Sequence, residues 1–131
     1  MKSLVVEDDF TNRLFLQTFL LRYGECHMAV NGKEALEAVR LAFEGGYPYD
    51  LICMDIMMPE MDGQEAVERV RLLEEARGVL STSGVKIVMT TAVTEMKEVF
   101  RSFRALCDAY LVKPIDTAEL VGLLQSFGLV E

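Results

Sequence analysis

Short apolar runs alternate with longer amphipathic stretches along the whole chain, and this alternation limits the possible folds more than any other feature. Each run has the length of a strand, and apolar residues recur with helical spacing in the stretches between the runs. Repeated strand–helix units predict a parallel sheet covered by helices on both faces. The predicted strands are Leu4 to Val6, Cys26 to Val30, Leu51 to Met54, Val85 to Met89 and Ala109 to Val112.

Five helices are expected between and after these strands. Asp9 is a suitable N-cap for the first helix, and Gly24 and Gly45-Gly46 are suitable stops for the first two. Right-handed crossovers that cover both faces favour the strand order 2-1-3-4-5. We therefore expect an α/β fold, a flavodoxin-like doubly wound five-stranded parallel sheet, in a single domain of residues 1–131. The predicted helices run from about Asp9 to Tyr23, Lys33 to Phe43, Gly63 to Arg77, Met96 to Leu106 and Leu120 to Phe127.

Composition excludes several classes of partner. With 13 basic and 21 acidic residues the net charge is -8, which disfavours direct binding to nucleic acid or to anionic membranes. No apolar run approaches the roughly 20 residues that cross a bilayer, and the acidic start does not resemble a signal peptide. Cys26, Cys53 and Cys107 form no CxxC pair, so we expect reduced core thiols and a cytoplasmic protein.

Acidic residues follow two strands that this order makes neighbours at the centre of the sheet. Glu7 and Asp8 follow the first strand, and Asp55 follows the third. Open α/β sheets bind ligands outside the carboxyl ends of their strands, at the point where the strand order reverses. Carboxylates about 4 to 5 Å apart repel one another by roughly 3 to 4 kcal/mol at an effective dielectric of 20, so the site calls for a divalent cation. Oxygen ligands suit Mg²⁺, with Mn²⁺ as an alternative.

Two more side chains are expected at the same edge. Lys113 follows the fifth strand and brings an ammonium group, and Thr91 follows the fourth and brings a hydroxyl. A carboxylate flanked by a metal, an ammonium and a hydroxyl suits phosphoryl transfer, which depends on positioning and on charge stabilisation. A small hydrolase with an aspartyl nucleophile is the rival class. Such enzymes usually carry a second Asp two residues on, where this chain has Met57, which cannot move a proton.

Four motifs resemble the receiver domain of two-component response regulators. They are V-V-E-D-D at the end of the first strand, D-I-M-M-P-E-M-D-G at the third, T-A at the fourth and K-P at the fifth, in the family's order and over essentially the whole chain. The resemblance implies that Asp55 accepts a phosphoryl group from a phosphohistidine of a sensor histidine kinase or phosphotransfer protein. Such a protein is a signalling switch and not an enzyme in the usual sense, although it catalyses its own phosphorylation and dephosphorylation.

The same resemblance implies the metal ligands. Asp8 and Asp55 would bind Mg²⁺ directly, together with the backbone carbonyl of Met57, and Glu7 would act through a bound water. Asp9 would then cap the first helix, and Arg13 matches an arginine that often follows the acidic pair.

The remaining implied roles concern switching. Thr91 and Lys113 would each bond a phosphoryl oxygen, and the Lys113-Pro114 peptide bond is expected to be cis. Tyr110 matches the aromatic residue that turns inward when the threonine moves. Met57 and Val93 are apolar where rapidly self-hydrolysing receivers are polar, so we expect a long-lived phosphoryl group.

The interaction surfaces can also be anticipated from the resemblance. The surface of helix four, strand five and helix five would meet a downstream protein. The first helix carries more apolar residues than a core stripe needs, and part of this apolar excess, such as Phe15 or Leu16, would meet the phosphodonor. We expect a stand-alone receiver, with a domain cut from a longer regulator and an unphosphorylated interaction module as alternatives. Both a monomer and a dimer are compatible with this reading. One departure from the family is the longer Gly78 to Gly84 connection, expected on the side away from the site.

Overall fold

The strands form one parallel sheet with the predicted order β2-β1-β3-β4-β5 in the computed structural model, which describes residues 1–80, 83–92 and 106–131. Two strands extend beyond their predicted ends. Asp55 is the last residue of β3 and pairs with Thr90, and the N–H of Ile56 donates to the Thr90 carbonyl, so the ladder continues through the polar ends of both strands. The strands are β1 (Ser3–Val6), β2 (Cys26–Ala29), β3 (Leu51–Asp55), β4 (Lys86–Thr91) and β5 (Ala109–Val112).

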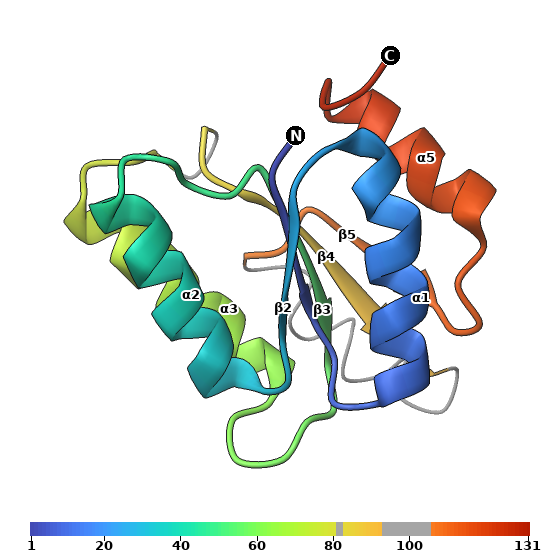
Figure 1. Cartoon of the computed structure of the whole chain (residues 1–131). Coiled ribbons are helices and arrows are strands. Elements are labelled where there is room, and N and C mark those ends of the chain that lie inside the picture. The colour runs from blue at the N-terminus through green and yellow to red at the C-terminus, as the bar shows by residue number, and fades with distance from the viewer. Residues whose placement is uncertain (81–82, 93–105) are drawn as a thin grey trace.

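Helices cover both faces of the sheet, as the alternating pattern predicts. Helices α1 and α5 lie on one face, and α2 and α3 lie on the other (Figure 1). They are α1 (Phe10–Leu20), continued by a 3-10 turn (Leu21–Tyr23), α2 (Gly32–Glu44), α3 (Gly63–Ala76) and α5 (Thr117–Ser126). The predicted helix from Met96 to Leu106 falls almost entirely on residues 93–105, outside the described residues. No helix among the described residues has the length and apolar character needed to span a bilayer.

Each of these helices begins at a side chain that caps it. The Asp9 carboxylate accepts a hydrogen bond from the N–H of Asn12, which confirms the predicted cap of α1. Asn31, Asp62 and Asp116 cap α2, α3 and α5 in the same way. Because parallel strands all end at one edge, these four caps lie along the edge where β1 and β3 deliver their acidic residues.

The core consists of two apolar layers, one under each pair of helices. Alternation along the strands assigns Leu4, Ile52 and Met89 to the layer under α2 and α3. Val5 and Cys53 belong to the layer under α1 and α5. Every residue of β1 and β3 is buried, as expected for the centre of a parallel sheet.

The lone histidine and the three cysteines have structural surroundings. His27 contacts the Tyr49 hydroxyl through Nδ1 (2.6 Å) and Glu25 through Nε2 (2.8 Å). All three cysteines are free thiols, and Cys26 and Cys53 are buried. Burial raises the pKa of Cys53 to about 12, so this thiol stays protonated and unreactive near neutral pH.

Candidate functional site

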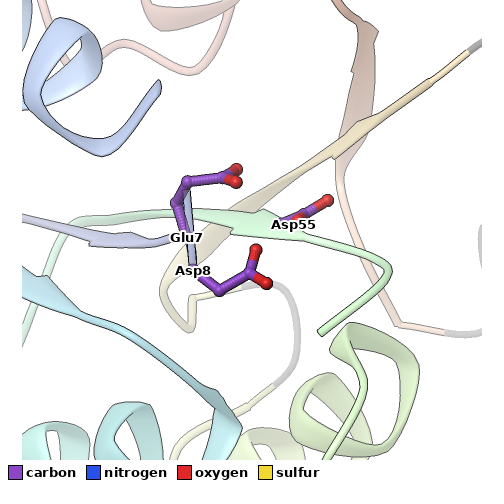
Figure 2. A group of neighbouring side chains, drawn as sticks. All are labelled: Glu7, Asp8 and Asp55. Carbon is purple, nitrogen blue, oxygen red and sulfur yellow. The ribbon is translucent and has the colours of Figure 1, made fainter. Parts of the chain in front are cut away.

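Three carboxylates meet where β1 and β3 end. They belong to Glu7, Asp8 and Asp55, and one carboxylate oxygen of each lies within 4.8 Å of the other two. Figure 2 shows the first two on the turn that follows β1 and the third at the end of β3. Glu7 and Asp55 are 1% and 5% exposed, whereas Asp8 is exposed. The arrangement therefore has two buried acids and one that solvent can reach.

The first turn of α1 holds the acidic pair in place. Arg13 donates from Nη1 to the backbone carbonyls of Glu7 (2.9 Å) and Asp8 (3.4 Å). The Glu7 carboxylate accepts a hydrogen bond from the N–H of Asp9. The backbone N–H of Glu7 donates to the Ala29 carbonyl in β2. Sequence reasoning noted Arg13 only by resemblance, because an arginine four residues past an N-cap carries no signal of a backbone contact.

Lys113 joins two of the acids. Its ammonium lies 3.0 Å from Glu7 Oε2 and 3.3 Å from Asp55 Oδ1. The N–H of Lys113 donates to the Thr91 carbonyl (2.7 Å), and the Lys113-Pro114 bond is cis as expected. Burial disfavours the ammonium, but the hydrogen bond to Glu7 and the charge of Asp55 outweigh it and raise the pKa of Lys113. The lysine therefore stays charged.

The ionisation of the Asp55 carboxylate is strongly perturbed. Burial and the nearby charge of Glu7 raise the pKa of Asp55 to about 7, although Lys113 acts in the opposite direction. One ammonium thus fails to compensate this cluster of carboxylates. Crowded, mutually repelling oxygens with one open side have the chemistry that a hard divalent cation prefers, so the residues present fit the predicted metal.

The loop from β3 to α3 folds tightly against the end of β3. A Cβ at Gly63 would lie 2.3 Å from the Asp55 carbonyl, and the N–H of Gly63 donates to Ile56 (2.8 Å), so only glycine fits here. Glu60 adopts a left-handed conformation (φ 68°). Met57 is 54% exposed on this loop. The sequence predicted that a helix begins near Gly63, but the close approach of this loop to β3 was visible only in three dimensions.

Thr91 and Tyr110 lie on the same face of the sheet. Met89 pairs with Tyr110, and Thr91 lies two residues beyond Met89, so alternation gives all three the same face. Tyr110 packs against the core layer under α2 and α3, and Thr91 is fully buried with its hydroxyl donating to the Ala92 carbonyl (3.0 Å). Thr90, which pairs with Asp55, has the opposite face.

An apolar surface borders the acidic cluster. A hollow of about 390 Å³ lies between α1 and the segment after β5, lined by Glu7, Phe15, Leu16, Lys113 and Pro114 among others. Phe10, Leu14 and Phe15 of α1 are 46% to 66% exposed, whereas Leu16 is buried. The outer face of α1 therefore carries exposed apolar side chains, whereas Leu16, which was expected to join them, belongs to the core.

Comparisons with known proteins agree on one family. The family model described as "Response regulator receiver domain" matches residues 3–125. A probable transcriptional regulator, ycf29, of Porphyra purpurea is 32% identical over 124 residues, which cover 94% of this chain and 54% of that protein. This chain spans about half the length of such curated relatives, or much less.

Solved structures agree with this match. The receiver domain of the histidine kinase CKI1 from Arabidopsis thaliana, complexed with Mg²⁺ and BeF₃⁻, has a TM-score of 0.77 at 29% identity and covers 97% of this chain and 89% of that one. The receiver domain of Ssk1 from Saccharomyces cerevisiae, in a co-crystal with the histidine phosphotransfer protein Ypd1, has a TM-score of 0.74 at 31% identity, with 98% and 88% covered.

Proposed function

Because the chain belongs to the response regulator receiver domain family, whose members are signalling switches and not typical enzymes, we propose that it accepts a phosphoryl group on Asp55. The donor would be a phosphohistidine of a sensor histidine kinase or phosphotransfer protein. The observation that carries this proposal is the meeting of Asp55 with Glu7, Asp8 and Lys113 at one edge of the sheet. Residues 1–131 would form a single domain around this site.

The transfer step uses the Asp55 carboxylate as nucleophile. One carboxylate oxygen attacks the phosphorus, an oxygen–phosphorus bond forms, and the bond from phosphorus to the imidazole nitrogen of the donor breaks, so that the electron pair leaves with the histidine. The Lys113 ammonium, 3.3 Å from Asp55, is placed to compensate negative charge on the transferred group. Its raised pKa keeps it charged for this role.

Asp8 and Asp55, with the backbone carbonyl of Met57, would hold Mg²⁺ directly, and Glu7 would act through a water. Exposed Asp8 suits direct ligation, whereas both Glu7 oxygens already accept hydrogen bonds, from Lys113 and from the N–H of Asp9. When bound, the cation would neutralise the carboxylates and the phosphoryl oxygens; Mn²⁺ is an alternative. The CKI1 receiver complexed with Mg²⁺ supports this assignment.

Thr91 would bond a second phosphoryl oxygen, and Tyr110 would respond by changing its packing. Their shared face of the sheet supports a direct coupling, because a shift of the Thr91 hydroxyl toward Asp55 would leave space on the face that Tyr110 occupies. A downstream protein would then read the surface of β5 and α5. The helix-four part of that predicted surface lies outside the described residues, except for Leu106. Val93, named above for the lifetime of the phosphoryl group, also lies outside them.

The phosphodonor would dock on the outer face of α1. The exposed side chains of Phe10, Leu14 and Phe15 lie beside the hollow that Glu7 and Lys113 line, so a partner bound there reaches the acidic cluster. The complex of Ypd1 with the Ssk1 receiver supports a phosphotransfer partner. Three free cysteines fit a reducing compartment such as the cytoplasm.

Phosphorylation by acetyl phosphate tests the central claim. With Mg²⁺ present, the wild-type protein should gain one hydroxylamine-labile phosphoryl group by mass spectrometry, and Asp55→Asn should gain none. An unmodified wild type under these conditions would leave the unphosphorylated interaction module as the better description. Modification that persists in Asp55→Asn would move the acceptor to another residue.

A second experiment separates docking from chemistry. Phe15→Glu should slow transfer from a phosphorylated phosphotransfer protein but leave the acetyl phosphate reaction unchanged, because Phe15 borders the site without contacting Asp55. Leu72→Glu is the matched control, since Leu72 is 63% exposed on α3. Equal losses with both donors would contradict a docking role for the α1 face.

A further inference from the structure

A second ionic cluster lies at the opposite edge of the sheet, where α3 packs against the amino ends of β4 and β5. Its centre is Arg71, whose side chain is 10% exposed. The guanidinium donates from Nη1 to Glu74 (2.8 Å) and to the Val85 carbonyl (2.8 Å). It also donates from Nε to the Leu106 carbonyl (2.9 Å) and from Nη2 to Asp108 (3.0 Å). One arginine thus joins the starts of two strands to α3.

The two carboxylates of this cluster also bond the strand backbones. Asp108 Oδ2 accepts from the N–H of Ile87 (2.8 Å), and the N–H of Asp108 donates to the Ile87 carbonyl (2.8 Å). Glu74 Oε2 accepts from the N–H of Val85 (2.7 Å). Gly84 leaves the necessary space, because a Cβ there would lie 2.4 Å from Glu74 Oε2. The cluster therefore specifies which residue of each strand faces which residue of its neighbour.

Such a specification matters most for β5. This strand has four residues, pairs with β4 alone among the described strands, and alternates buried with half-buried positions. A slip by one residue would reverse its faces, but a slip by two would keep the alternation and move the strand by about 7 Å. Lys113 follows β5 directly and reaches Asp55 at 3.3 Å, so a slip of that size would remove it from the site.

We propose that Arg71 and Asp108 set the register of β5 against β4 and thereby position Tyr110 and Lys113 for the phosphoryl group. Both are positioning residues, because they act through β5 and lie at the far edge of the sheet. The functional part of this inference rests on the proposed phosphorylation of Asp55, whereas the register part does not.

The chemistry of the cluster suits a role in setting the register of β5 better than a role in stabilising the fold. Desolvating an arginine and two carboxylates opposes folding, and apolar residues of similar size often stabilise such a position equally well or better. Apolar contacts, however, tolerate a two-residue slip of an alternating strand. Directional hydrogen bonds from one planar guanidinium to Asp108, Leu106 and Val85 do not tolerate it.

The test compares Arg71→Met and Asp108→Ala with a control variant, Arg69→Met. Arg69 lies on the same helix and pairs with Glu65 in solvent. Mg²⁺ affinity, the rate of phosphorylation by acetyl phosphate and the hydrogen exchange of β5 amides are measured where every variant is folded. In the first two variants the rate should fall by about 10- to 100-fold, as a misplaced group predicts. Their Mg²⁺ affinity should not fall, because the acids lie on β1 and β3, and their β5 amides should exchange faster.

Wild-type rates and wild-type exchange in folded Arg71→Met would overturn the inference and leave a stabilising role only. If Arg71→Met does not fold, Asp108→Ala decides in the same way, since it removes the oxygen that accepts from Arg71 and from the N–H of Ile87. A wild-type protein that takes no phosphoryl group would instead refute the proposed function. Hydrogen exchange of β5 would then still decide the register.

Discussion

Replacing Asp55 by Asn should stabilise the metal-free protein above neutral pH, although it removes the proposed phosphoryl acceptor. The reason is that the folded protein holds the Asp55 charge against burial and against the charge of Glu7, and Lys113 compensates only in part. Asparagine has the same shape without the charge. Lys113 lies 3.0 Å from Glu7 and should keep this contact in the variant.

The size and the pH dependence of this effect follow from the raised pKa of Asp55. Its rise from 3.8 to about 7 corresponds to about 4 kcal/mol at high pH, since one pKa unit is worth about 1.4 kcal/mol. Solvent screening at the open rim reduces this to about 2 kcal/mol. Because the folded state holds more protons than the unfolded state between these two pKa values, the stability of the wild type falls as pH rises through this window. The variant lacks this dependence.

Urea unfolding in the presence of a chelator measures the difference. At pH 8 the Asp55→Asn midpoint should exceed that of the wild type by about 1 M, and at pH 5 the gap should shrink, for a slope near 2 kcal/mol per M. Asp62→Asn is the charge-matched control, because Asn caps α3 as well as Asp does. Saturating Mg²⁺, at about a hundred times its Kd, should restore about 2.7 kcal/mol to the wild type and less to the variant. A variant no more stable than the wild type at pH 8 would refute this account of the Asp55 environment.

Three further substitutions follow from the same geometry. Lys113→Met should destabilise the metal-free protein by about 2 kcal/mol in urea unfolding at pH 8, because Glu7 and Asp55 lose the ammonium that pairs with them. It should also abolish rapid phosphorylation. A variant as stable as the wild type would contradict the ion pairs. Met57→Asn should shorten the lifetime of the phosphoryl group, because an amide can hold an attacking water and a thioether cannot. The decay rate of the phosphorylated protein measures this lifetime, and an unchanged rate would argue against the prediction. Glu60→Asn should raise stability by about 0.5 kcal/mol in thermal unfolding, because Asn tolerates positive φ, whereas Glu60→Ala should gain nothing.

Much of the fold could be predicted because the strands are buried on both faces. Short runs such as Leu51 to Met54, bounded by turn residues, have the length and character of central strands in a covered sheet. Right-handed crossovers then favour one strand order, which the structure confirms. The ends of strands were less certain. β4 continues to Thr91 because its backbone has partners in β3 and β5, whatever its side chains are.

The meeting of the acids with Lys113 could also be predicted, because strand topology alone brings the carboxyl ends of β1, β3 and β5 to one edge. The sequence did not predict which of these acids is buried. Glu7 and Asp8 are neighbours in sequence, yet one is 1% exposed and the other is exposed, since only the strand end carries the first into the interior. The pairing of the Lys113 ammonium with both Glu7 and Asp55 likewise depends on side-chain packing.

The sequence by itself therefore determined the sheet, the strand order and the residues that reach the acidic edge, because local hydrophobic pattern and chain connectivity are sufficient for these. Only the tertiary structure decided the ionisation of Asp55 and the role of Arg71. In the sequence Arg71 is one of several charged residues on α3. Its burial arises from the packing of α3 against the starts of β4 and β5, and contacts between residues 37 positions apart leave no local pattern.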